Sequence, residues 1–167
     1  MRILGIDPGY AITGYAVLDL IDGKFNVVDY GLIRTPAKTY FPKRLLTISQ
    51  GIEQIIERHQ PHVMAIEELF FARNTTTAIG TAQARGVIIV SAARAGIPVF
   101  EYTPMQVKVA VTGYGKAEKQ QVQEMVRVLL KLRETPKPDD VADAIAVAIC
   151  HGHSGNLPEA LAVGGYQ

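Results

Sequence analysis

The first third of the chain has the hydrophobic pattern of β-strands. After a short apolar run at residues 3–6, residues 13–21 (TGYAVLDLI) and 24–35 (KFNVVDYGLIRT) are rich in β-branched and aromatic side chains. Asp22 and Gly23 separate these two stretches, and a two-residue Asp-Gly connection is a strong hairpin signal. We therefore expect three strands, of which the second and third form a hairpin.

From Pro42 the apolar residues recur at helical spacing, and Pro61 ends that pattern. Two short apolar runs, at residues 62–67 and 97–102, suit strands covered on both faces. We expect a helix over residues 78–96, which lies between these runs, although Val87 to Val90 would also suit a strand.

The last third of the chain predicts three helices. Thr103 and Pro104 favour the start of a short helix that ends near Gly113, and a longer amphipathic helix begins at Ala117. The final helix is expected from Asp139 to about His151. The element order predicts an α/β domain at residues 1–153, with one mixed five-stranded sheet flanked by helices, and a loose tail at 154–167.

Composition narrows the class of protein. The chain has 167 residues, of which 48% are hydrophobic and 20% charged, and this balance is typical of a single soluble domain. No apolar run approaches the ~18–20 residues that cross a bilayer, and no signal peptide is recognisable, so we expect a cytoplasmic protein without membrane contact. The single cysteine, Cys150, excludes an internal disulfide framework, and we expect a buried, inert thiol. His151 and His153 beside it are not spaced to share a metal ion.

Charge is spread unevenly along the chain. The formal net charge is only +1, but residues 105–137 hold seven lysines and arginines against three glutamates. Such a stretch could meet a polyanion, and it could equally be a solvated helix face.

Four acids lie at the ends of apolar elements. Asp7 follows the first strand, Glu67 ends a predicted central strand, and Asp140 and Asp143 lie three residues apart on the almost wholly apolar last helix. Asp139, in contrast, is best explained as a helix-capping residue. A buried carboxylate is costly unless it is paired or bound to metal. If the four converge, Mg²⁺ or Mn²⁺ would remove the repulsion, and two such ions are typical of phosphoryl transfer.

Six short motifs follow one another from residue 3 to about residue 153. They are GIDPG, AIEELFFARN, ARGV, VFEYTPMQVK, GKAEKQQVQEMV and DDVADAIAVAI. Together they resemble the RuvC family of Holliday-junction resolvases. The resemblance implies a ribonuclease H-like fold, a Mg²⁺-dependent site of four acids, and a homodimer that cuts opposed strands of a four-way DNA junction. It also implies 5′-phosphate and 3′-hydroxyl products, and cooperation with the RuvA–RuvB branch-migration complex.

Carried over residue by residue, the resemblance assigns both catalysis and metal binding to Asp7, Glu67, Asp140 and Asp143. Two ions per site are expected, and Mn²⁺ is expected to substitute for Mg²⁺. Strand alternation predicts that Glu68 points away from Glu67.

The stretch after the strand that ends at Glu67 contains candidate DNA contacts. The resemblance favours an exposed Phe70 that stacks on an unpaired base at the junction, with Arg73 and Asn74 holding backbone or base edges. Phe71 is expected to pack on the core.

Lysines complete the predicted DNA surface. Lys108 and Lys119 resemble family lysines near the active site, where an ammonium group would neutralise phosphate. Lys116 could act in the same way or be merely exposed, and Arg85 could face DNA or a dimer contact.

Two other functions are considered. The segment GIDPGYAITGYAVLD also resembles the phosphate loop of actin-like ATPases and sugar kinases, but those proteins need two such lobes and no second copy is present. A junction-binding protein that does not cleave should have lost at least one of the acids, and all four are present.

Overall fold

The computed structural model describes residues 1–69 and 75–155 and builds them around one five-stranded sheet. The strands are β1 (Arg2–Asp7), β2 (Ile12–Ile21), β3 (Lys24–Arg34), β4 (Val63–Glu67) and β5 (Val99–Tyr102). Their order across the sheet is β3-β2-β1-β4-β5, with β2 antiparallel to β1 and β3, and with β4 parallel to β1 and β5. The predicted mixed five-stranded sheet is confirmed.

The predicted hairpin is also confirmed, and its turn has the backbone that the sequence requires. Asp22 and Gly23 have φ values of 50° and 74°, and a two-residue hairpin loop with positive φ at both positions matches the twist of the strands it joins.

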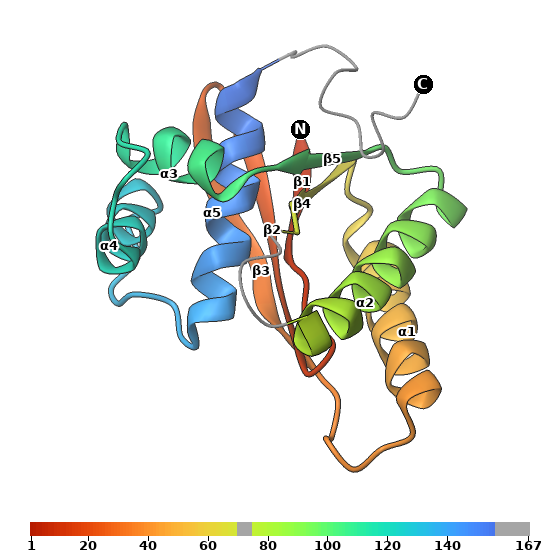
Figure 1. The fold of residues 1–167 in the computed structure, drawn as a ribbon. Helices are drawn as coiled ribbons and strands as arrows, with labels where there is room; N and C mark the ends of the chain where they lie inside the picture. Colours follow the sequence, from red (N-terminus) through yellow and green to blue (C-terminus); the bar gives the residue numbers. More distant parts are fainter. Residues whose placement is uncertain (70–74, 156–167) are drawn as a thin grey trace, which may run out of the picture.

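Helices cover both faces of the sheet (Figure 1). One face is covered by α1 (Phe41–His59) and α2 (Thr75–Arg94), and the other by α5 (Asp139–Ser154), with α3 (Pro104–Thr112) and α4 (Lys119–Leu129) packed outside α5. Each face has its own buried core. Val87 to Val90 are therefore part of a helix, as expected, and not of a strand. None of the described helices has the length and apolarity needed to span a membrane.

The helix boundaries follow local capping chemistry. Thr103 caps α3 through a reciprocal pair of hydrogen bonds with Gln106, and Gly113 ends the helix at φ 75°. Helix α4 begins at Lys119 and not at Ala117, because Glu118 forms the capping box.

Helix α5 also differs slightly from the expected range, because it continues to Ser154. Cys150 is buried in it, and burial raises the pKa of its thiol to about 12, in agreement with the predicted inert thiol. Residues 156–167 lie outside the described part of the chain.

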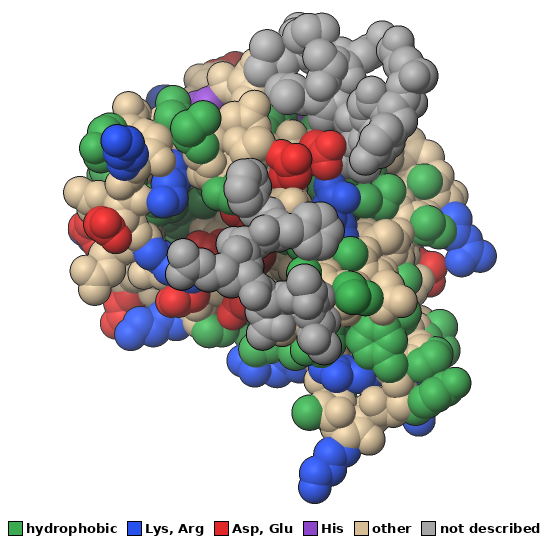
Figure 2. Space-filling view, in the orientation of Figure 1, with side chains coloured by type: hydrophobic (Ala, Val, Ile, Leu, Met, Phe, Trp, Pro, Cys, Tyr) green, Lys and Arg blue, Asp and Glu red, His purple; other side chains and the backbone are tan. Residues whose placement is uncertain are grey.

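Part of the α1–α2 surface is apolar and exposed. Leu46, Ile79 and Val90 are each more than half exposed, and a shallow groove between the two helices is lined by Leu45, Val87 and neighbouring residues. Figure 2 shows hydrophobic side chains on this side of the molecule.

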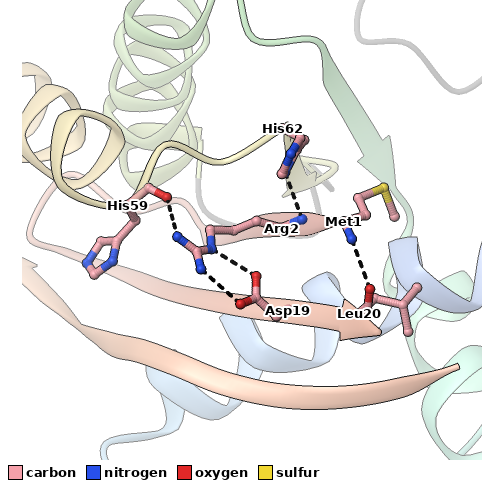
Figure 3. Close-up of polar contacts among 6 residues, drawn as sticks. All are labelled: Met1, Arg2, Asp19, Leu20, His59 and His62. Atoms are coloured by element: carbon pink, nitrogen blue, oxygen red, sulfur yellow. Dashed lines mark hydrogen bonds and ion pairs between the residues drawn. The ribbon is translucent and has the colours of Figure 1, made fainter. Parts of the chain in front are cut away.

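The start of β1 is fixed by a set of polar contacts (Figure 3). The Arg2 guanidinium donates to both carboxylate oxygens of Asp19 at 2.8 and 2.9 Å, and to the backbone carbonyl of His59 at 2.8 Å. The backbone N–H of Arg2 donates to His62 Nδ1 at 2.9 Å. These contacts hold the N-terminal end of β1 against β2 and against the segment leading into β4. They thereby help to position the C-terminal end of β1, where Asp7 lies.

Candidate active site

Strand register brings two of the predicted acids together. In the parallel pair of β1 and β4, Ile3 lies opposite Val63 and Ile6 opposite Ile66, so Asp7 and Glu67 are the next residues at the carboxyl ends of neighbouring strands. The side chains of a strand alternate between faces. Val63 and Ala65 belong to the core on the α5 side, so Glu67 points toward α5 as well.

Glu68 lies just past the end of β4, and the predicted direction of its side chain stays a prediction. Met64 and Ile66 belong to the core beneath α1 and α2, and continued alternation would place the Glu68 side chain on that side of the sheet. Its backbone N–H donates to the carbonyl of Tyr102 at 2.9 Å.

Two glycines allow α5 to lie close to the sheet. Gly14 pairs with Asp7 across β2 and β1, and a Cβ at position 14 would be only 2.0 Å from the Asp140 carbonyl oxygen. A Cβ at Gly5 would be 2.2 Å from the Ala144 carbonyl oxygen. Because real Cβ atoms do not come so near, only glycine permits this contact. The start of α5, with Asp140 in its first turn and Asp143 one turn further along, therefore lies against Asp7.

The electrostatics confirm that the acids are near one another. Burial, followed by the charges of Glu67, Asp143 and Asp140 in that order of size, raises the pKa of Asp7 to about 8. Burial, followed by the charge of Asp143, raises the pKa of Glu67 to about 7, and burial also raises the pKa of Asp143. At neutral pH these carboxyls cannot all be ionised without added positive charge.

Lys119 supplies one positive charge. Its Nζ lies 2.9 Å from Asp143 Oδ2 and 3.3 Å from Asp139 Oδ2, and its charge lowers the pKa of both Asp7 and Glu67. The structure thus brings Lys119 to the acids, as the sequence predicted.

The donor set of this site fits a hard divalent cation. Carboxylate oxygens are the ligands that Mg²⁺ and Mn²⁺ prefer, and the raised pKa values show acids that lack a counter-charge. Within residues 1–69 and 75–155, however, no three acid, histidine or cysteine side chains are already gathered around one point as metal ligands. Oδ2 of Asp143 accepts a hydrogen bond from Lys119 Nζ, so a cation at this site would share the Asp143 carboxylate with the lysine or displace the lysine from it.

Asp139 has a different partner from the one expected. It lies in the first turn of α5, where the helix dipole favours an acid, but no side-chain capping hydrogen bond forms there. Its carboxylate accepts a hydrogen bond from Gln123 Nε2 at 3.0 Å and pairs with Lys119. Asp139 and Gln123 therefore hold Lys119 from α4 and α5, a role that only the packing of these helices reveals.

The remaining predicted DNA contacts are less closely tied to the acids. Lys108 is half-exposed on α3 and Lys116 is exposed between α3 and α4, and no ion pair in the described part of the chain joins either lysine to an acid. In the view of Figure 2, acidic and basic side chains adjoin one another on the side of the molecule formed by α4 and α5. The predictions for Phe70, Phe71, Arg73 and Asn74 fall outside the described residues.

Arg85 makes contacts within the chain, and its prediction as a DNA or dimer contact stays a prediction. Its side chain is only 14% exposed and reaches from α2 to the backbone of Glu67 and to the carboxylate of Glu101.

Comparison with known proteins identifies close relatives. Residues 3–151 match the family model described as crossover junction endodeoxyribonuclease RuvC. The chain is 60% identical over 157 residues to the crossover junction endodeoxyribonuclease RuvC of Desulfitobacterium hafniense, covering 94% of this chain and 95% of the relative. It is 54% identical over 164 residues to that of Caldanaerobacter subterraneus subsp. tengcongensis, covering 98% and 99% of the two chains.

Solved structures are similar over the same range. T. thermophilus RuvC in complex with a Holliday junction substrate superposes with a TM-score of 0.88 at 36% identity, covering 92% of this chain and 93% of that one. The yeast mitochondrial Holliday junction resolvase Ydc2 superposes with a TM-score of 0.66 at 15% identity, which shows a shared fold alone.

Proposed function

The chain belongs to the RuvC family of crossover junction endodeoxyribonucleases, and we propose that Asp7, Glu67, Asp140 and Asp143 form its metal-dependent active site. It has the ribonuclease H-like fold of that family and acts as a Holliday-junction resolvase in DNA recombination and repair. The match over residues 3–151 leaves the nucleotide-binding alternative without support.

The convergence of acids from three elements carries this proposal. Asp7 on β1 and Glu67 on β4 lie at neighbouring strand ends, and the glycine contact places the first turn of α5 beside them. The charges of neighbouring acids raise the pKa values of Asp7 and Glu67, and a bound divalent cation would relieve this repulsion.

Each acidic side chain then has a part in the reaction. Asp7, whose pKa is raised by the charges of all three other acids, is the central ligand, and Glu67, Asp140 and Asp143 complete the set. A pair of Mg²⁺ ions bound there, with Mn²⁺ as a substitute, supplies Lewis-acid activation of water and of the scissile phosphate. Cleavage leaves 5′-phosphate and 3′-hydroxyl ends.

Lys119 contributes before and during DNA binding. In the metal-free protein its ammonium group compensates the negative charge of Asp143. When Asp143 turns toward the ions, this ammonium group is free to meet a phosphate oxygen of the substrate.

Further residues are assigned to DNA binding. Phe70 stacks on a junction base, Arg73 and Asn74 hold the neighbouring strand, and Lys108 and Lys116 contact phosphates. Because phosphate contacts dominate such binding, affinity for the junction should fall steeply with salt.

Two opposed strands are cut, and each chain has one such set of acids, so the active species is a homodimer. The exposed apolar surface of α1 and α2, which includes Leu46, Ile79 and Val90, suits contact with a second copy. We place the protein in the cytoplasm, where it cooperates with RuvA–RuvB.

An immobile four-way junction tests this function. With Mg²⁺, the protein should make paired nicks at symmetric positions, leave a linear duplex of the same sequence intact, and yield ends that DNA ligase reseals without further treatment. No cleavage in EDTA is expected. Nicks in linear duplex at the same rate, or cleavage that persists in EDTA, would contradict the proposal.

A further inference from the structure

We propose that Arg85 is a positioning residue for the junction-cleavage reaction, which holds the end of β4, and with it the Glu67 carboxylate, in register with Asp7. Glu101 anchors Arg85 for this task. The inference rests on the proposed role of Glu67 and goes beyond it by naming residues outside the acid cluster on which the cluster depends.

The contacts of Arg85 join three elements. From α2, its Nε donates to the backbone carbonyl of Glu67 at 3.3 Å, and its Nη2 forms an ion pair with Glu101 Oε2 on β5. Glu101 lies directly opposite Ile66, the residue before Glu67. The Arg85 side chain is 14% exposed and that of Glu101 29%, so solvent screens this pair less than it screens a surface pair.

This support comes where β1 no longer pairs with β4. The paired register of β1 and β4 ends at Ile6 and Ile66, and Pro8, the residue after Asp7, has no N–H with which to extend it. On its other edge β4 still pairs with β5, because Glu67 lies opposite Tyr102 and the Glu68 N–H donates to the Tyr102 carbonyl at 2.9 Å. The Arg85 donor on the Glu67 carbonyl adds a second restraint on the same peptide, which helps to set the direction of the Glu67 side chain, and catalytic groups require placement within about 0.5 Å.

Helix α2 touches the other catalytic strand end as well. A Cβ at Gly80 would lie 2.9 Å from the Tyr10 ring, so α2 packs closely against the loop that follows Asp7. One helix thus reaches the neighbourhood of both strand-borne acids, through the contact of Gly80 with the Tyr10 ring and through the hydrogen bond of Arg85 to the Glu67 backbone.

Arg94→Met provides a matched control for Arg85→Met. Arg94 lies on the same helix, is 75% exposed, and pairs at 3.7 Å with Glu53, far from the acids in sequence and in structure. Arg85→Met keeps a long side chain in the half-buried site but removes both contacts. Arg85→Lys keeps the charge yet lacks the planar fork that reaches two acceptors at once.

The cleavage rate of each variant is measured under single-turnover conditions on a four-way junction, at saturating protein and Mg²⁺. Junction affinity in EDTA and the thermal unfolding temperature are measured for the same variants. Arg85→Met should lower the cleavage rate by about 10–100-fold, the usual cost of losing a residue that orients a ligand, with junction affinity within about twofold of wild type. Arg85→Lys should recover part of the rate, Glu101→Gln should lose less than Arg85→Met, and Arg94→Met should be unchanged.

Two results would overturn the inference. Wild-type cleavage by Arg85→Met would show that Glu67 needs no such support, and a loss of affinity equal to the loss of rate would make Arg85 a DNA contact. If circular dichroism shows that Arg85→Met does not fold, the test uses Glu101→Gln in its place. That variant keeps the Arg85 side chain and removes only the charge of its partner. A wild-type cleavage rate in Glu101→Gln then refutes the inference. Failure of the proposed function itself would appear in the wild-type protein, whereas failure of this inference appears only in the variants.

Discussion

Replacing Asp7 by asparagine should stabilise the metal-free protein even though it removes the central acid of the site. Burial and neighbouring acids raise the pKa of Asp7 from 3.8 to about 8 in the folded protein. The unfolded chain has no such environment and releases this proton near pH 3.8. Because the folded state holds the proton more tightly, the contribution of Asp7 to stability is greatest below pH 4 and falls as the pH rises toward 8.

The size of the effect follows from the pKa shift. One pH unit between the two pKa values corresponds to about 1.4 kcal/mol, and roughly three units separate pH 3.8 from pH 7, so ionisation of Asp7 costs about 4 kcal/mol at neutral pH. A domain of this size is stable by roughly 5–15 kcal/mol, so the cost is a large share of the total. An asparagine at position 7 does not ionise, so the Asp7→Asn variant avoids this cost.

Urea unfolding in EDTA at several pH values measures this directly. The free energy of unfolding of Asp7→Asn should exceed that of wild type by an amount that grows by about 3 kcal/mol between pH 5 and pH 8. Glu68→Gln, which alters a carboxylate that strand alternation predicts on the other face, should show no such growth. A difference between Asp7→Asn and wild type that is constant with pH would refute the argument that Asp7 is buried among acids.

Three further substitutions test the packing and charge of the site. Gly14→Ala should displace the first turn of α5, lower the free energy of unfolding by about 1–3 kcal/mol and reduce cleavage. Gly86→Ala should be tolerated, because a Cβ at that position meets no atom within 4 Å. Equal stability and cleavage in the two variants would contradict the close contact at Gly14. Tyr102→Phe removes the hydroxyl bonded to His151 Nδ1 at 2.7 Å and should cost about 1–3 kcal/mol in urea unfolding, with junction cleavage unchanged. Lys119→Met removes a charge that lowers the pKa values of the acids, so the rising limb of the cleavage rate against pH should move to higher pH; a move to lower pH would show that the lysine does not act on them.

Much of the fold could be predicted because its signals are local. The Asp22–Gly23 turn required positive φ at both positions and has it. The α3 helix begins and ends where Thr103 and Gly113 indicated.

The parts that the sequence did not reveal depend on contacts between distant elements. That Gly14 lets α5 approach the sheet requires knowing that β2 lies beneath the start of α5. Asp139 has the position of a capping residue, but the packing of α4 on α5 offers it Lys119 instead. Arg85 reaches Glu67 only because α2 crosses the end of β4. Pattern and spacing describe single elements and carry no information about such pairings.

The most direct test of the proposed site compares four single variants, Asp7→Asn, Glu67→Gln, Asp140→Asn and Asp143→Asn, with Glu68→Gln as the control. For each, the rate of junction cleavage in Mg²⁺ is measured beside junction affinity in EDTA. Each of the four should cleave at least about a hundredfold more slowly than wild type while still binding the junction, because a metal ligand matters more than the outer partners whose loss costs about 10–100-fold. Glu68→Gln should cleave normally. Near-normal cleavage by any of the four, or an equal loss in Glu68→Gln, would contradict the assignment of these acids to one active site.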